Sequence, residues 1–290
     1  MKKLLGRTHD YLSLIRFSHT IFAMPFALAG YFIGATRPGY GFSLKTFLLV
    51  LACMVFARSA AMGFNRWADM YFDSLNPRTA VREIPSGKIT PRQALLFVTV
   101  SSLLFILSAA LLNKLTFILS PVALIIVLGY SYTKRFTPLC HLVLGLGLSL
   151  APIGAYLAVT GSFALLPLLY SFIVLTWVSG FDIIYSLQDD QFDRDTGLYS
   201  IPAVMSRGKA LAISVVLHLI TAALVVVAGV YGQAGFIYWT GAAIFTGLLI
   251  FQHMIVRPDD LSRVNLAFGT TNGISGVIFG LAVVLDLLLL

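Results

Sequence analysis

The sequence predicts an all-helical integral membrane protein, and three observations lead to that prediction. Apolar residues make up 58% of the 290-residue chain and charged residues only 11%. The mean hydropathy is +0.90, which a water-soluble domain of this size could not tolerate on its surface. The apolar residues also occur in runs of about 20, the length at which a helix crosses a hydrocarbon core of roughly 30 Å.

Nine such runs lie between charges and turn residues, so we expect nine transmembrane helices around one central cavity in a single domain, residues 1–290. In chain order the predicted spans are about 14–36, 44–64, 92–112, 115–132, 140–160, 163–185, 209–230, 233–255 and 264–286. No small-residue cleavage pattern follows the first run, so we expect that span to be retained rather than removed as a signal peptide.

The placement of positive charge predicts the orientation of these helices. The chain contains twenty Lys and Arg residues, and only Arg37, Lys45 and Lys114 fall on one side of the predicted topology. The other seventeen lie on the opposite side, which the positive-inside rule makes cytoplasmic together with the N-terminus. The net charge of +8 therefore indicates a bacterial-type inner membrane and its lipid rather than a nucleic acid, and no segment indicates an obligate protein partner.

Acidic residues are concentrated in two windows on the predicted cytoplasmic side. Eight of the twelve lie there, after the second and the sixth predicted helices. A spacing of four residues, or of seven and four, places side chains on one helical face if each helix continues past the membrane. The two predicted stripes are Asn65, Asp69 and Asp73 in the first window, and Asp182, Asp189 and Asp193 in the second.

These stripes predict a site for Mg²⁺ and a diphosphate. Clustered carboxylates repel one another, more so when partly desolvated, and a divalent cation would neutralise them. A set of oxygen ligands without His or Cys favours Mg²⁺, which binds through one or two carboxylates and takes phosphate oxygens as further ligands. Nearby cations that could balance the remaining phosphate charge are Arg66, Arg78, Arg82, Lys88, Lys134 and Arg135.

The alternative interpretation is that the acids form ordinary surface salt bridges with the same arginines, which contribute little and need no ligand. We expect that for Glu83, Asp190 and Asp195, which lie off the two stripes. For the aligned aspartates we favour a site, because two stripes on one side of the membrane are difficult to obtain by chance.

The two Asp motifs resemble those of a known family. NRWADMYFD, residues 65–73, matches the NxxxDxxxD motif of the UbiA superfamily of membrane prenyltransferases, and DIIYSLQDDQFD carries the second motif, DxxxD, at Asp189 and Asp193. FSHTIFAMPFAL and GFDIIYSLQDDQFDRDTGLYSIP look most similar to the 4-hydroxybenzoate polyprenyltransferase group. A branch of that group is thought to use a dihydroxynaphthoate acceptor on a route to menaquinone.

The resemblance implies an Mg²⁺-dependent aromatic prenyltransferase of quinone biosynthesis that uses a polyprenyl diphosphate and an aromatic acid. The implied metal ligands are Asn65, Asp69, Asp73, Asp189 and Asp193. The implied diphosphate-binding residues are Arg66, Arg78, Arg82, Lys134, Arg135 and Tyr132, although Tyr132 could instead anchor the membrane interface.

For catalysis, Lys134 and Arg135 would share the charge that develops on the leaving diphosphate, and Asp189 would help to deprotonate the acceptor. Candidate acceptor-binding residues are Arg16, Arg58, His19 and Asp182. Each arginine could instead snorkel to the interface or be paired structurally.

A transporter is the main alternative of another class, since ionisable residues in a membrane bundle often line a solute path. It predicts charge distributed through the membrane depth. Here the acids gather on one side, which favours a capped cavity. A lipid-binding scaffold without catalysis would not need two aligned carboxylate stripes.

Overall fold

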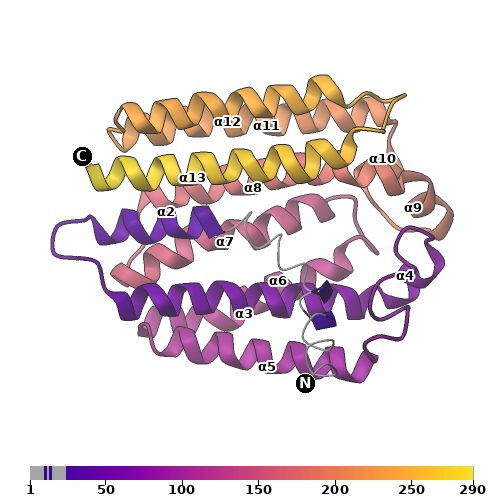
Figure 1. Cartoon of the computed structure of the whole chain (residues 1–290), viewed down its shortest axis with the longest axis horizontal. Coiled ribbons are helices and arrows are strands. Elements are labelled where there is room, and N and C mark those ends of the chain that lie inside the picture. Colours follow the sequence, from indigo (N-terminus) through magenta and orange to yellow (C-terminus); the bar gives the residue numbers. More distant parts are fainter. Residues whose placement is uncertain (1–9, 12, 15–23, 290) are drawn as a thin grey trace.

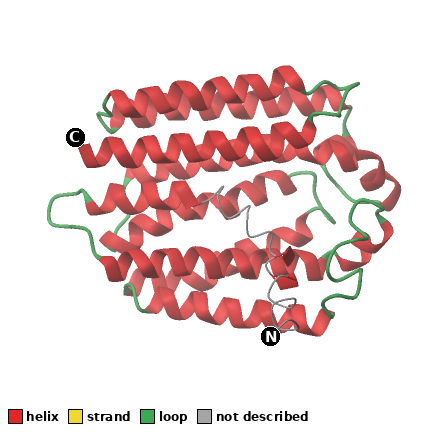
Figure 2. Ribbon diagram, in the orientation of Figure 1, coloured by secondary structure: helices red, strands yellow, loops and turns green. Residues whose placement is uncertain are grey.

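The computed structural model describes residues 10–11, 13–14 and 24–289, and every element in these ranges is a helix (Figure 2). The long helices are α3 (Leu44–Ala68), α5 (Pro91–Ala110), α6 (Lys114–Thr133), α7 (Cys140–Thr160), α8 (Leu165–Ser186), α11 (Arg207–Tyr231), α12 (Phe236–Ile255) and α13 (Asn272–Leu289). The shorter elements are α2 (Met24–Ala35), α4 (Met70–Leu75), the 3₁₀ turn η2 (Leu187–Asp189), α9 (Asp190–Thr196), α10 (Ile201–Val204) and the π-helical segment η3 (Leu266–Thr271).

The predicted all-helical membrane fold is confirmed. Within the described ranges, eight helices are long and apolar enough to cross a membrane, and they correspond to the second to ninth predicted spans. The first predicted span, 14–36, lies partly outside the described residues. Its described part includes α2, which has 12 residues, so the count of nine spans stays a prediction.

The bundle is organised around α8. Inside the protein, 67% of the most apolar part of this span is buried, compared with 17% for α6. The chain packs α8 against α7 and α11, while α3 packs against α5 and α6 on the other side of the molecule (Figure 1). The largest fully buried side chain, Trp177 of α8, contacts the rings of Phe26, Phe181 and Phe245. A rigid aromatic core therefore fixes the position of the helix that carries the second Asp motif.

Small residues let the helices approach closely. At Gly30 of α2, an added Cβ would lie 2.0 Å from the carbonyl oxygen of Pro152 in α7. That space can hold only a glycine, as in other membrane helix pairs that use small residues to pack. The contact ties α2 to α7.

The short helices gather at one end of the bundle. There α4, α9 and α10 lie together with the loops that follow them (Figure 1). Both predicted Asp motifs end in these segments, since α4 contains Asp73 and α9 contains Asp193. The fold thus brings the two polar windows, more than a hundred residues apart in sequence, to the same end.

Candidate active site

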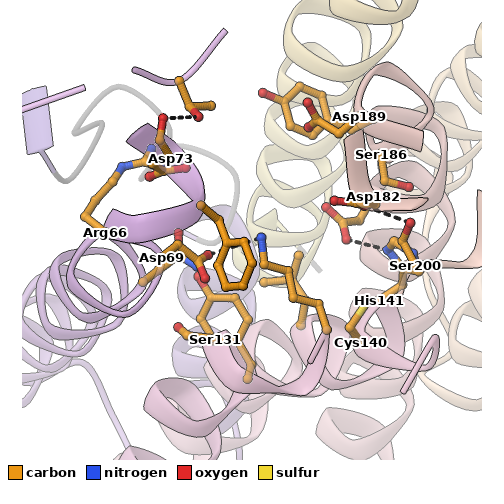
Figure 3. A pocket seen from close by; sticks show the side chains of 18 of the residues that line it. Arg66, Asp69, Asp73, Ser131, Cys140, His141, Asp182, Ser186, Asp189 and Ser200 are labelled. Atoms are coloured by element: carbon orange, nitrogen blue, oxygen red, sulfur yellow. Dashed lines mark hydrogen bonds and ion pairs between the residues drawn. The ribbon is translucent and has the colours of Figure 1, made fainter. Parts of the chain in front are cut away.

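The site is a cavity of about 290 Å³ whose lining comes from both halves of the chain. Figure 3 shows Asp69 and Asp73 on one side and Asp182 and Asp189 on the other. Of the predicted site residues, those that line the cavity are Arg58, Asn65, Arg66, Asp69, Asp73, Arg78, Arg82, Lys134, Asp182, Asp189 and Asp193. The structure therefore brings most of the predicted set together around one space.

Each Asp motif lies on a bend rather than on the unbroken helix that its spacing predicts. Helix α3 ends at Ala68, and Asp69 (φ −92°, ψ 5°) is the N-cap residue just before α4. Helix α8 ends at Ser186, and Asp189 (φ −112°, ψ 4°), the last residue of η2, is the N-cap residue just before α9. Both aspartates thus lie in or near the sparsely populated bridge region of backbone conformations, where many active-site residues are found.

The first bend still keeps its residues in helical register. The N–H of Asp69 donates to the carbonyl of Asn65 at 2.9 Å, and the N–H of Asp73 donates to the carbonyl of Asp69 at 2.8 Å. These bonds preserve the four-residue spacing, so the three motif side chains stay near one another. The Asn65 amide donates to Oδ2 of Asp69 at 3.1 Å.

Two buried carboxylate oxygens of the first bend accept no hydrogen bond, and we call them bare, although one of them lies within ion-pair distance of Arg135. Oδ2 of Asp69 lies 3.4 Å from Nζ of Lys134, and Oδ1 of Asp73 accepts from Arg82 at 2.6 Å. Arg135 Nη2 lies 3.6 Å from Oδ1 of Asp69. Among the described residues, however, Oδ1 of Asp69 and Oδ2 of Asp73 have no hydrogen-bond partner.

Burial raises the pKa of Asp69 above its ordinary value, Lys134 opposes that rise, and the neighbouring Asp73 adds to it. Arg135 opposes the rise as well. A further cation beside the bare oxygens would stabilise the charged form of this buried carboxylate.

The second bend is satisfied by hydrogen bonds. Nε and Nη2 of Arg78 donate to the two oxygens of Asp189, the first at 3.0 Å, and the Asn76 amide donates to Oδ1 at 3.1 Å. Asn76 Oδ1 also accepts from the backbone N–H of Arg78 at 2.9 Å, an Asx turn that sets this arginine in place. Asp193 accepts from the hydroxyl of Ser200 at 2.9 Å.

Aromatic rings close the cavity on the side of α8 and η3. The centroid of the Phe268 ring lies 4.1 Å from that of Tyr185 and 5.5 Å from that of Phe181. Phe268 belongs to the π-helical segment η3, and π-bulges occur frequently at functional sites. Further in, the lining is apolar and includes Leu144, Leu148 and Val178. The cavity therefore has a charged end and an apolar end.

Some predicted site residues lie elsewhere. Arg135 and Tyr132 pack beside the cavity, with the guanidinium 4.7 Å from the centre of the Tyr132 ring. Arg16 and His19 lie outside the described residues. Arg58 does line the cavity, and its Nε has no hydrogen-bond partner in the described part of the chain.

Two residues of the lining have partners that spacing did not indicate. His141 received no role from the sequence, yet its Nδ1 lies 2.7 Å from Oδ2 of Asp182. The hydroxyl of Tyr185 accepts from Arg78 at 3.0 Å. Both contacts join residues distant in sequence, so no local pattern could have revealed them.

The acids expected to lie off the site do so. Asp190 forms ion pairs as expected, but its partners are Arg194 and Arg207 rather than the arginines named for the diphosphate. Glu83 and Asp195 instead accept from Ser13 and Gln191. None of the three acids is part of the cavity lining.

The donor set fits Mg²⁺ shared with a substrate. Within the described ranges, no three His, Cys, Asp or Glu side chains lie close enough to hold a metal ion by themselves. Mg²⁺ does not require such a cage, because it usually binds one or two carboxylates and completes its shell with water and phosphate oxygens. The bare oxygens of Asp69 and Asp73 meet that requirement.

Fold and site together define an all-helical membrane protein with carboxylates and cations gathered around a cavity at one end. Residues 23–277 match the UbiA prenyltransferase family, and the chain belongs to that family of aromatic prenyltransferases. It is 32% identical over 248 residues to the 4-hydroxybenzoate octaprenyltransferase of Nitrosospira multiformis, covering 84% of each chain. It is 33% identical to the enzyme of the same name from Vibrio parahaemolyticus, over 80% of this chain and 81% of that one.

Solved structures have the same fold. A UbiA homologue from Aeropyrum pernix, in its apo form, superimposes with a TM-score of 0.84 at 36% identity, covering 93% of this chain and 98% of the other. A homologue from Archaeoglobus fulgidus bound to GPP and Mg²⁺ has a TM-score of 0.69 at 21% identity, over 95% and 99% of the two chains. The predicted family and enzyme class are thus confirmed.

Proposed function

We propose that the chain is a single-domain, Mg²⁺-dependent enzyme that transfers a polyprenyl group from its diphosphate to a ring carbon of an aromatic acid, 4-hydroxybenzoate, in quinone biosynthesis. The observation that carries this proposal is the pair of bare, buried oxygens on Asp69 and Asp73, opposite the second Asp motif. The names of the curated relatives support the choice of acceptor.

The metal would be held by Asn65, Asp69, Asp73, Asp189 and Asp193. When bound, Mg²⁺ shields the charge of a diphosphate and makes it a better leaving group. The homologue from Archaeoglobus fulgidus, which binds GPP and Mg²⁺, supports a metal and a prenyl diphosphate as a joint ligand.

The cations of the site would bind the diphosphate itself. We assign that role to Arg66, Arg78, Arg82, Lys134, Arg135 and Tyr132. Arg78 and Arg82 line the cavity and engage Asp189 and Asp73, so their guanidinium groups are already oriented. Lys134 and Arg135 flank Asp69 and would stabilise charge as the carbon–oxygen bond breaks.

The aromatic wall would protect the allylic cation left behind. Phe181, Tyr185 and Phe268 line the cavity beside its charged end. Their ring faces attract a cation, and their apolar surface excludes the water that would otherwise trap it. A ring carbon ortho to the acceptor's hydroxyl then forms the new bond.

The carboxylate of the acceptor needs a cationic partner, and we propose Arg58. It lines the cavity, and its Nε lacks a hydrogen-bond partner among the described residues. Asp182 would contact the acceptor from α8, with Asp189 as the candidate base. Arg16 and His19 remain candidates from the segment outside the described ranges.

We also propose the orientation that the charge bias predicts, with nine spans in a bacterial inner membrane. The N-terminus and the mouth of the cavity would face the cytoplasm, where soluble aromatic acids and Mg²⁺ are available. The short helices that carry both motifs lie at one end of the bundle (Figure 1), which agrees with a single aqueous mouth.

A prenylation assay tests the function. Purified protein in lipid nanodiscs would receive geranyl or longer diphosphates with Mg²⁺ and, separately, 4-hydroxybenzoate, 1,4-dihydroxy-2-naphthoate or 1,4-dihydroxy-6-naphthoate. We expect prenylated 4-hydroxybenzoate as the main product, no product with EDTA, and restoration by added Mg²⁺. Preferential prenylation of a naphthoate would overturn the acceptor assignment. No prenylated product and no Mg²⁺-dependent diphosphate release would overturn the function.

A further inference from the structure

A buried histidine contacts the one motif carboxylate whose role is least defined. His141 lies in the first turn of α7, and its side chain is 2% exposed. Its Nδ1 is 2.7 Å from Oδ2 of Asp182 (Figure 3). Its Nε2 is 3.2 Å from the backbone nitrogen of Ile201. The ring therefore bridges α8 and the start of α10.

These two contacts fix the tautomer of His141. A backbone N–H can only donate, so Nε2 must offer its lone pair to Ile201. In a neutral imidazole the proton is then on Nδ1, and it is donated to Asp182. Asp182 is thus held in one orientation by the hydrogen bond from His141.

Asp182 and Asp189 differ in what their oxygens can still accept. Both oxygens of Asp189 receive N–H groups from Arg78, and one also receives the amide of Asn76. A carboxylate whose two oxygens both accept from a guanidinium has little room left for a hydrogen bond from a substrate hydroxyl. Asp182 is 21% exposed and lines the cavity, and its hydrogen bond with His141 leaves it further lone pairs.

We propose that Asp182, oriented by His141, accepts the proton of the acceptor's hydroxyl group in place of Asp189, the candidate base of the motif, and that His141 is its positioning residue. This inference rests on the proposed function. The donor's carbon–oxygen bond breaks with its electron pair going to diphosphate, and the ortho ring carbon bonds to the allylic carbon as the hydroxyl proton moves to Asp182. The resulting dienone loses the proton of its tetrahedral carbon to water and its oxygen regains one from Asp182, so one proton is released overall.

The other side of His141 connects this base to the second bend. Ile201, which donates to Nε2, directly follows Ser200, whose hydroxyl donates to Asp193. Ser200 also caps α10 by accepting from the N–H of Ala203 at 3.3 Å. One short segment thus holds both the imidazole ring and a proposed metal ligand, which would keep the base at a constant distance from the diphosphate.

Two isosteres separate the two sides of the ring. In His141→Asn the side-chain amide replaces Nδ1–H and can still donate to Asp182. In His141→Gln the amide reaches the position of Nε2, so it satisfies Ile201 and leaves Asp182 without its donor. We expect kcat to fall about 10²-fold in His141→Ala and His141→Gln and to recover to within about tenfold in His141→Asn.

A donor-binding measurement separates a base from a metal ligand. The probe is geranyl S-thiolodiphosphate with Mg²⁺, which binds without turnover. Asp182→Asn should lower kcat by about 10²- to 10³-fold while its Kd for this probe stays within about twofold of wild type. The inference would be overturned if His141→Gln recovered kcat as well as His141→Asn does. It would also be overturned if the Kd of Asp182→Asn for the probe rose along with the loss of kcat.

A buried histidine outside the cavity provides the control. His218 is 4% exposed and bonds the carbonyl of Trp177 at 3.2 Å. His218→Ala should lower the melting temperature but change kcat by no more than about twofold. A wild-type enzyme without prenylation activity contradicts the proposed function, whereas an active wild type with unaffected Asp182→Asn kinetics contradicts this inference alone.

Discussion

The two Asp bends of the molecule share a backbone design but differ in how their charge is balanced. Asp69 and Asp189 have almost the same ψ, 5° and 4°, and each is followed four residues later by a second aspartate on a short helix. At the first bend two buried oxygens are bare. At the second bend both oxygens of Asp189 are hydrogen-bonded by Arg78.

This difference indicates a division of work between the bends. The first bend has two buried oxygens that accept no hydrogen bond, so it is the better place for a metal. The cation that pairs with Asp189 at the second bend is Arg78, which lies between α4 and α5, in the segment that follows the first bend. The two halves of the chain therefore interlock through one guanidinium.

Loss of either leading aspartate should have the largest effect. Asp69→Ala and Asp189→Ala should each lower prenylation at least about 10³-fold, or roughly 4 kcal/mol of transition-state stabilisation, because each removes a proposed metal ligand. Product formation measured by chromatography checks this. Melting temperatures near the wild-type value would show that both variants are folded, and wild-type rates in either would remove the metal assignment.

The arginines should have intermediate effects that differ between the bends. Arg78 donates to Asp189 through two nitrogens, whereas Arg82 contacts Asp73 through one. Lysine cannot reproduce a bidentate contact, so Arg78→Lys should raise the KM for the diphosphate about tenfold and Arg82→Lys only about threefold. Steady-state kinetics at saturating acceptor measure both, and equal effects would argue against the proposed role of Arg78 as a link.

A salt bridge outside the cavity should have the smallest effect. Arg194 pairs with Asp190 but its side chain is 41% exposed, and Arg207 also contacts that aspartate. Arg194→Ala should therefore change the free energy of unfolding by only about 0.2–1 kcal/mol. Denaturation and activity assays check this, and a large loss of kcat would place Arg194 in the active site.

The sequence predicted the helices well because their signals are local. The expected span 140–160 matches α7, and 209–230 falls within α11, because each is a long apolar run ended by charge or turn residues. The four-residue spacing of Asn65, Asp69 and Asp73 also holds across the bend. Their proximity depends only on helical periodicity, which can be predicted from the spacing of the residues in the sequence.

The remaining features depend on tertiary contacts. The bends at Asp69 and Asp189 contain no Pro or Gly, the residues from which a break in a helix can be predicted. The partnership of His141 with Asp182 spans 41 residues and that of Arg78 with Asp189 spans 111. Such pairs arise from how α7, α8 and the segment after α4 pack, which no periodicity encodes.

The central claim is that both bends form one diphosphate site, and a double-mutant cycle tests it most directly. The Kd of geranyl S-thiolodiphosphate with Mg²⁺ would be measured for the wild type, Asp69→Asn, Asp189→Asn and the double variant. A shared site predicts that the double variant loses little more affinity than the weaker-binding single variant, with a coupling energy above about 1 kcal/mol. Losses that add to within about 0.5 kcal/mol would mean that the bends act independently and would contradict the claim.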